Sequence, residues 1–143
     1  MEIETQYDQK SPNHGMLIQF PTGLLGFEEF KDYRLLSSET EKDLHWLQPV
    51  ENEAIEFAVT LPQIYQINYE ISLNDDEEQS LDFEENDEII VLVTLSKKEN
   101  PKPGEPLLNA NFMAPIIINA SKQLGLQKTL NQEQSPVTIT MKG

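Results

Sequence analysis

Ile89-Ile90-Val91-Leu92-Val93-Thr94-Leu95 is the stretch that decides the fold of this chain. It is continuous, apolar and rich in β-branched residues, which favour the pleated geometry of a strand. An apolar run without alternation is typical of a strand that is buried on both sides. We therefore predict that residues 89–95 form a central strand covered on both faces.

The surrounding sequence predicts further strands. Residues 65–73 alternate between apolar and polar with a period of two, so one face of this strand should be buried and the other wet. Other brief apolar runs, separated by turn formers, lie at 16–20, 33–36, 44–47, 55–59, 115–118 and 137–140. Short strands at this spacing are typical of a closed or nearly closed all-β barrel, or of a sandwich.

Helical signals are weak in this sequence. One or two turns are predicted at 28–33, and another at 120–125, where Gly125 would end the helix. The predicted fold class is all-β: a small barrel-like antiparallel domain with one or two short helices. At 143 residues, the chain is expected to be a single domain spanning 1–143, with the proline-rich segment 100–106 as an exposed loop.

The chain is strongly acidic, with 25 Asp and Glu against 10 Lys and Arg and a formal net charge of -15. Such a surface repels phosphate backbones, which proteins bind chiefly through Lys and Arg, so we expect no direct nucleic-acid binding. The charge favours a basic protein partner through electrostatic steering. The alternative is that the charge only keeps the protein soluble.

The compartment is indicated by what the sequence lacks. There is no Cys, which excludes disulfides and thiolate chemistry. The N-terminus has no basic region followed by an apolar run, and no stretch approaches the roughly 18 apolar residues of a membrane helix. We expect a cytoplasmic protein that contacts no membrane.

Catalytic motifs are missing from the sequence. The two histidines, His14 and His45, lie in a turn-like context and in a short apolar run. No serine sits in a Gly-x-Ser-x-Gly elbow, and no glycine-rich loop ends in Lys-Ser or Lys-Thr. We therefore expect no catalytic residues, no cofactor and no enzyme activity.

Residues 74–88 form an acidic run with nine carboxylates in fifteen residues. Some of its residues match the spacing of the first ligands of a calcium-binding loop. That loop also needs a Gly and a Glu at positions where this chain has Asp87 and Val93. We therefore predict no metal site. We expect a mobile, solvated segment, or a docking or repelling surface in which Phe83 is an apolar anchor beside Glu84 and Glu85.

The segment 20–27 predicts a stiff turn. Its proline has a fixed φ, and Gly23 and Gly26 supply the positive φ that a tight turn needs. Leu24, Leu25 and Phe27 are then presented together. They form either a plug that seals the end of the barrel or an exposed apolar ridge that docks a partner helix.

A second segment, 111–119, places Asn at both ends of an apolar run. Pro115 has no N–H, so it should start a strand or lie at an edge. Asn111 and Asn119 either satisfy backbone groups at the strand ends or contact a partner.

At these residues the chain resembles the FliW family of bacterial flagellar assembly factors. The family motifs Ile-x-Phe, Gly-Leu-x-Gly-Phe-Glu and a following Tyr are present at Ile18, Phe20, 23–28 and Tyr33. The later Asn-Leu-x-Ala-Pro-(apolar)3-Asn motif is matched by 111–119, with Phe112 in place of Leu. The motifs occur in order over about residues 3–130, but Pro49 replaces a family Ser and the family's Tyr-containing ending is missing.

The resemblance implies a small, β-barrel-like, non-enzymatic protein with two competing protein partners, flagellin and the RNA-binding translational repressor CsrA. It implies an allosteric antagonist of CsrA that is released when it binds flagellin and is a monomer when free. The alternatives are a flagellin chaperone without a regulatory role, or a nucleic-acid mimic that blocks the RNA site. The predicted partner-binding positions are Leu24, Leu25, Phe27, Phe83, Glu84, Glu85, Asn111 and Asn119. The predicted structural motif positions are Phe20, Gly23, Gly26, Tyr33 and Pro115.

Overall fold

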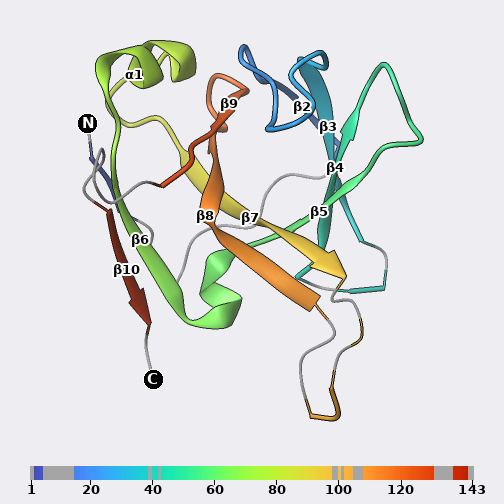
Figure 1. Cartoon of the computed structure of the whole chain (residues 1–143). Helices are drawn as coiled ribbons and strands as arrows, with labels where there is room; N and C mark the ends of the chain where they lie inside the picture. Colours follow the sequence, from blue (N-terminus) through green and yellow to red (C-terminus); the bar gives the residue numbers. More distant parts are fainter. Residues whose placement is uncertain are drawn as a thin grey trace.

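Among the residues that the structure describes, seven strands form a closed barrel, and three others form a small sheet beside it (Figure 1). The computed structural model describes residues 2–4, 15–38, 40–41, 43–97, 100, 102–104, 108–130 and 137–141. The barrel order is β2-β3-β4-β5-β7-β8-β9, and the side sheet has the order β1-β6-β10. The elements are β1 (Glu2–Glu4), β2 (Met16–Gln19), β3 (Asp32–Ser37), β4 (His45–Pro49), β5 (Phe57–Thr60), η1 (Pro62–Tyr65), β6 (Ile67–Ser72), α1 (Asp75–Leu81), β7 (Ile89–Lys97), β8 (Leu108–Asn119), β9 (Leu124–Gln127) and β10 (Val137–Met141).

The barrel closes through one short contact. All neighbouring strands pair antiparallel except β2 and β9, which run parallel and meet at Gln19 and Leu124. Next to this bridge, the Gln19 N–H donates to the carbonyl of Gln123 at 3.0 Å. The prediction of a small antiparallel all-β barrel is confirmed.

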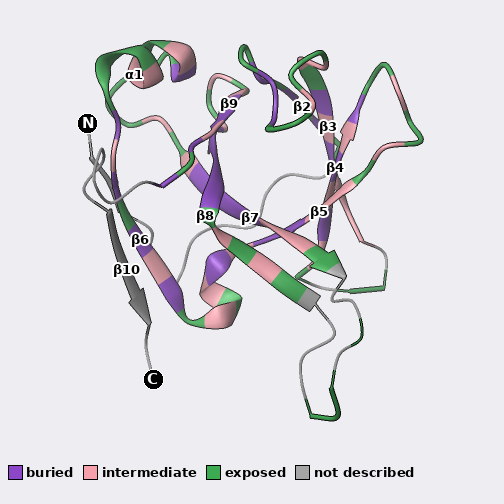
Figure 2. Cartoon of the chain, in the orientation of Figure 1, coloured by how far each residue is buried: buried purple, intermediate pink, exposed green. Residues whose placement is uncertain are grey.

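Strands β7 and β8 are shared by two apolar cores. Ile90 and Leu92 belong to the core inside the barrel, whereas Val91 and Val93 belong to a second core under β6. The C-terminal half of β8 is buried in the same way (Figure 2). The prediction of cover on both faces is therefore confirmed for residues 90–93, whereas Ile89, Thr94 and Leu95 are only partly buried.

Strand β6 supplies the cover of the second core. Ile67, Tyr69, Ile71 and Leu73 are buried, whereas Glu70 between them is exposed. The alternating pattern of 65–73 predicted this division correctly. The first residues of the pattern instead form η1, and Gln66 leaves that helix with a left-handed φ of 60°.

The positions of the helices were predicted wrongly. Residues 28–29 lie in a turn, and β3 begins at Asp32. Residues 120–123 also form a turn, in which Gln123 has a φ of 58°, and Gly125 lies inside β9. Pairing of β9 with β8 outweighs the weak local signal at 120–125, and the α-helix lies instead in the acidic run.

Pro115 lies inside β8, so the prediction that it starts a strand or lies at an edge is wrong. The register between β7 and β8 shifts here: Leu92 pairs with Ile116, but Thr94 pairs with Asn111. A bulge tolerates proline because its residues are not bonded to the neighbouring strand. The carbonyl of Pro115 instead accepts from the N–H of Lys128 at 3.1 Å.

In the proline-rich segment, residues 100 and 102–104 are exposed, and the rest of 100–106 lies outside the described residues. Within the described part of the chain, no helix is long and apolar enough to cross a membrane.

Candidate functional site

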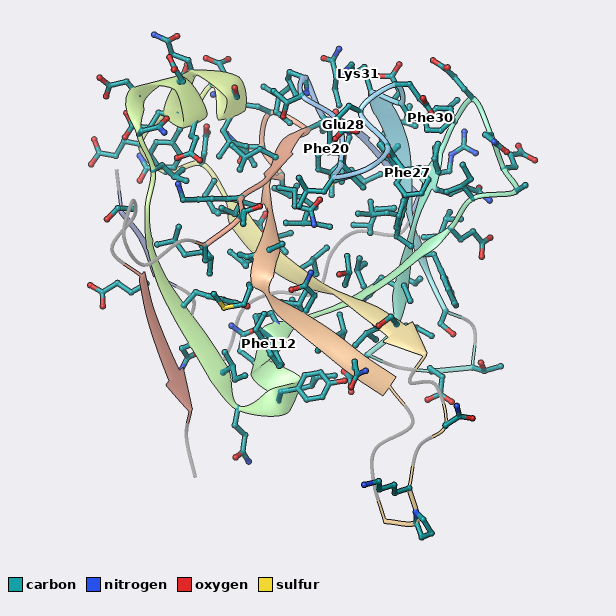
Figure 3. All side chains as sticks on the ribbon, viewed as in Figure 1. Phe20, Phe27, Glu28, Phe30, Lys31 and Phe112 are labelled. Carbon is teal, nitrogen blue, oxygen red and sulfur yellow. The ribbon has the colours of Figure 1, made fainter. Side chains whose placement is uncertain are left out.

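The turn between β2 and β3 closes one end of the barrel (Figure 3). Phe20 and Tyr33 meet edge to face with ring centroids 5.2 Å apart, and Phe27 meets Phe57 in the same way at 4.9 Å. The N–H of Phe27 donates to the carbonyl of Leu24 at 2.8 Å, which makes a tight turn of 24–27. The turn is therefore fastened by aromatic contacts and by its own backbone.

The turn presents one apolar side chain to solvent and buries another. Leu24 is 3% exposed and belongs to the barrel core, whereas Leu25 is 53% exposed. Phe27 is half-buried against Phe57. Leu24 and Phe27 thus plug the end of the barrel. Of the three apolar residues Leu24, Leu25 and Phe27, only Leu25 is exposed to solvent.

Leu25 is held in place from β9. Its N–H donates to Oε1 of Gln127 at 2.9 Å, and Nε2 of Gln127 donates to the carbonyl of Ala114 at 3.1 Å. At Gly26, the N–H donates to Oε1 of Glu28 at 3.1 Å. This bond is the main reason why the pKa of Glu28 lies below its usual value.

The acidic run carries a capped helix. Asn74 is the N-cap: its side chain accepts from the N–H of Glu77 at 2.9 Å, and the Glu77 side chain accepts from the N–H of Asn74 at 2.9 Å. Four acids occupy the first turn, where the helix dipole favours negative charge. The sequence predicted either a mobile, solvated segment or a docking or repelling surface at 74–88, and the structure shows a regular, capped helix in its first half.

A buried lysine fastens this helix to the barrel. Nζ of Lys128 donates to both carboxylate oxygens of Glu77, at 2.7 and 2.9 Å. The Lys128 side chain is 6% exposed and that of Glu77 is 20% exposed. Glu77 therefore caps the helix and pairs with a buried cation at the same time, so its charge is not part of the free acidic surface.

Asn119 fastens the second half of the run. Its Nδ2 donates to the carbonyl of Leu81 and to Oδ2 of Asp87, both at 2.9 Å. Nζ of Lys122 also donates to Oδ2 of Asp87, at 3.0 Å. The bond from Asn119, followed by those from the Glu84 N–H and Lys122, lowers the pKa of Asp87 to about 2. Asn119 is 0% exposed.

The other predicted positions of the acidic run differ in exposure. Phe83 is half-buried beside an open hollow of about 360 Å³ that is also lined by Asp75, Glu78 and Asp82. Glu85 is exposed, and the side chain of Glu84 is 71% exposed at 3.5 Å from Lys122.

The turn and the acidic helix share one end of the molecule, with β9 between them (Figure 1). A pocket of about 250 Å³ joins them, lined by Thr22 from the turn, by Leu126 and Gln127 from β9 and by residues of 74–80. Asn111 is exposed at the other half of β8, where its Oδ1 accepts from the N–H of Met113. The structure thus brings most predicted positions to one end and leaves Asn111 outside it.

The sequence interpretation missed the residues that organise this end: Glu77, Asp87, Lys122 and Lys128. One signal was available, because Asn74-x-x-Glu77 has the spacing of a capping box. The two lysines carried no local signal, since each acts on a residue far away in the chain. Among the described residues, no group of His, Asp or Glu side chains could hold a metal ion.

Comparison with known proteins identifies the family. The model of the family described as FliW protein matches residues 2–141. The chain belongs to the FliW family. The resemblance predicted from the motifs is therefore confirmed.

Several FliW proteins are similar to this chain over most of its length. A flagellar assembly factor FliW of Azoarcus sp. is 38% identical over 135 residues, which cover 92% of each protein. Flagellar assembly factor FliW 1 of Desulfotalea psychrophila is 36% identical over 130 residues, which cover 90% of each. A crystal structure of the flagellar assembly factor FliW superposes with a TM-score of 0.68 at 29% identity, covering 88% of this chain and 85% of that one.

Proposed function

We propose that this chain is a protein-binding regulator of flagellar assembly. It binds a CsrA-type RNA-binding translational repressor away from the RNA surface and lowers its affinity for RNA. Flagellin competes for the chain, so flagellin that is not yet assembled releases the repressor. The chain acts in the cytoplasm as a free monomer and catalyses no reaction.

The observation that supports this proposal is the acidic end of the barrel. Asp75, Asp76 and Glu85 are exposed on a segment whose backbone is held by a capping box and two lysines. A protein that binds RNA carries basic residues, and a fixed negative surface docked beside them lowers the potential that attracts RNA. Exposed Leu25 adds an apolar contact at the same end.

Calorimetry with CsrA from the same organism tests the proposal first. We expect binding to CsrA that excess flagellin abolishes. The CsrA–RNA affinity should fall in the presence of the chain without full competition, which separates an allosteric antagonist from a nucleic-acid mimic. A chain that binds neither protein would contradict the proposal.

The electrostatic part has its own test with matched charge changes. Asp75→Asn with Glu85→Gln removes two exposed charges from the acidic end, and Glu51→Gln with Glu53→Gln removes two from the β4–β5 turn. We expect only the first pair to slow association with CsrA, and the difference between the pairs should shrink as salt is added. Equal effects of both pairs would mean that net charge, not this surface, acts.

The second candidate function is a flagellin chaperone without a regulatory role, and exposed Leu25 favours it. Leu25→Ser leaves the core intact, because this side chain is 53% exposed. A chaperone predicts that Leu25→Ser weakens flagellin binding while CsrA does not bind the wild-type chain at all. CsrA binding by the wild-type chain would reject this candidate.

A further inference from the structure

An apolar row crosses the outer face of the barrel away from the acidic end. Leu36 pairs with Trp46, Trp46 with Ala58, and Ala58 with Leu95, so the four residues lie side by side on β3, β4, β5 and β7. Their neighbours along the strands, such as Leu35 and Leu47, are buried in the barrel, so these four side chains face outward. All four are half-buried. We call them the outer stripe.

The apolar character of the stripe is unusual, because the solvent-facing side of an antiparallel sheet is normally polar. The next row on the same strands follows the rule: Arg34 pairs with Gln48, and Nε2 of Gln48 donates to Oε1 of Glu56 at 3.2 Å. Further round the barrel, the outward Val91 and Val93 are covered by β6. The outer stripe continues that apolar face beyond the part that β6 covers.

The stripe leads into an open pocket. Leu95, its last residue, lines a pocket of about 510 Å³ together with Leu44, Ile64 and Tyr65. Ile64 is 44% exposed on η1, where the cover supplied by β6 has ended. Glu41 and Asp43, both exposed, form the acidic part of the lining. We call this the η1 pocket.

We propose that the outer stripe and the η1 pocket together bind a cationic amphipathic helix of a partner protein. The stripe spans three strand spacings, about 14 Å. A helix presents apolar side chains at i, i+4, i+7 and i+11 over about 16 Å, so one such face covers the stripe. Lysine or arginine beside that face reaches Glu41 and Asp43.

Other occupants fit less well. The strands that carry the stripe are paired on both sides within the barrel, so an incoming strand finds no free edge there. A second copy of this chain brings another net charge of -15 and is repelled. The cationic helix is the occupant that matches both the apolar row and the acidic lining.

Trp46, the only tryptophan of the chain, reports on the stripe directly. The probe is a designed 18-residue amidated peptide of Leu, Ala and Lys without aromatic residues, with Leu at i, i+4, i+7 and i+11. Its controls are a scrambled peptide of the same composition and a version with Glu in place of Lys. We expect calorimetric binding of the first peptide only, together with a shift of the Trp46 emission to shorter wavelength.

Variants of the protein locate the binding. Ala58→Glu should lower the peptide affinity at least tenfold, and Ile64→Ser, on an exposed side chain, at least threefold. Glu41→Gln with Asp43→Asn should lower it in a salt-dependent manner. Leu25→Ser and Asp75→Asn with Glu85→Gln should leave it unchanged, so the result is independent of the function proposed for the acidic end. Circular dichroism confirms that each variant folds.

Three outcomes would overturn the proposal. The first is the absence of binding, which is expected if a segment of the chain itself covers the stripe. The second is equal binding of the scrambled peptide or equal affinity in Ala58→Glu. The third is a concentration-dependent dimer in sedimentation that protects Trp46, which would assign the stripe to a second copy.

Discussion

At the scale of single residues, two glycines that look equivalent in the sequence differ in the structure. Gly23 has a φ of 70° and Gly26 has a φ of 82°. Residues with a side chain rarely adopt these backbone angles. A Cβ on Gly23 would lie 2.6 Å from the Cα of Glu28, whereas a Cβ on Gly26 would meet no atom within 4 Å. The turn therefore needs glycine at 23 for space as well as for conformation.

Gly23→Ala should be clearly more destabilising than Gly26→Ala. We expect Gly26→Ala to lower the free energy of unfolding by about 1 kcal/mol, the cost of a left-handed alanine. Gly23→Ala should lower it by about 3 kcal/mol, because the turn must also open around Glu28. Urea titrations of the two variants check this, and equal losses would show that the backbone of Glu28 yields freely.

The hydroxyl groups of two core tyrosines also differ. Tyr33 is 0% exposed and its hydroxyl has no hydrogen-bond partner among the described residues, whereas that of Tyr69 donates to the carbonyl of Phe112 at 2.6 Å. Burial, and then Glu29 and Glu28, raise the pKa of Tyr33 to about 12, so the ring is neutral.

Tyr33→Phe should leave the stability unchanged or raise it by up to about 1 kcal/mol, because it removes a polar atom without a partner. Tyr69→Phe should cost about 1 kcal/mol, since the carbonyl of Phe112 loses its donor. Thermal and urea unfolding measure both. A Tyr33→Phe variant that is destabilised by as much as Tyr69→Phe would mean that the Tyr33 hydroxyl has a partner in solution.

At the scale of elements, α1 is a short helix whose position depends on its attachments. It has seven residues, fewer than an isolated helix needs to be stable in water. Its capping box, the Glu77–Lys128 pair and the bonds of Asn119 supply what its length does not.

Lys128→Met should lower the free energy of unfolding by about 2 kcal/mol, below the 3–5 kcal/mol of a fully buried pair because Glu77 still reaches water. Adding Glu77→Gln should recover about half of this loss, because glutamine keeps the capping box and leaves no unpaired charge. Glu84→Gln, at an exposed pair, is the control and should cost less than about 0.5 kcal/mol. A double variant no more stable than Lys128→Met would contradict the ion-pair explanation.

Asp87 makes the attachment of this segment sensitive to acid. Its pKa falls from 3.8 to about 2 on folding, so the carboxylate contributes stability above pH 3.8 and loses that contribution as the pH falls toward 2. The stability difference between the wild type and Asp87→Asn should therefore shrink over this range, which chemical denaturation at several pH values measures. In Asn119→Ala, carboxyl NMR should give a higher pKa for Asp87. A difference that stays constant with pH would contradict the assignment.

At the scale of the whole molecule, the barrel and the side sheet are joined through β7 and β8. Ile116 lies in the barrel core and Ile117 in the core under β6, and both are 0% exposed. Because the two cores use the same strands, we expect neither to persist without the other. That the chain is a single domain stays a prediction, and unfolding tests it.

Ile116→Ala and Ile117→Ala should each lower the free energy of unfolding by about 3 kcal/mol, as for other buried large-to-small changes. Trp46 lies on β4, in the barrel, so its fluorescence reports on the barrel alone. We expect both variants to shift the Trp46 transition and the circular dichroism transition together. If Ile117→Ala left the Trp46 midpoint unchanged, the two parts would unfold separately.

Sequence reasoning found the strands whose pattern is local and missed the elements whose stability is not. The alternation of 65–73 and the apolar run 89–95 predicted β6 and β7 because burial of a strand face follows from the order of residues along it. Strand β9 and helix α1 were missed because β8 and Lys128 stabilise them from a distance. Asn119 was predicted either to hydrogen-bond backbone groups or to contact a partner. Its side chain donates to the backbone carbonyl of Leu81, which is the first of these two roles.

The sequence by itself determined the all-β class, the doubly buried central strand, the acidic character and the family, because each depends on residue type and order alone. Only the tertiary structure decided that Leu24 is buried while Leu25 is exposed, that Glu77 is paired, and that Leu36, Trp46, Ala58 and Leu95 form one row. These properties depend on which strands become neighbours. Strand neighbours are chosen by packing between segments that are far apart in the chain, and no local pattern records that choice.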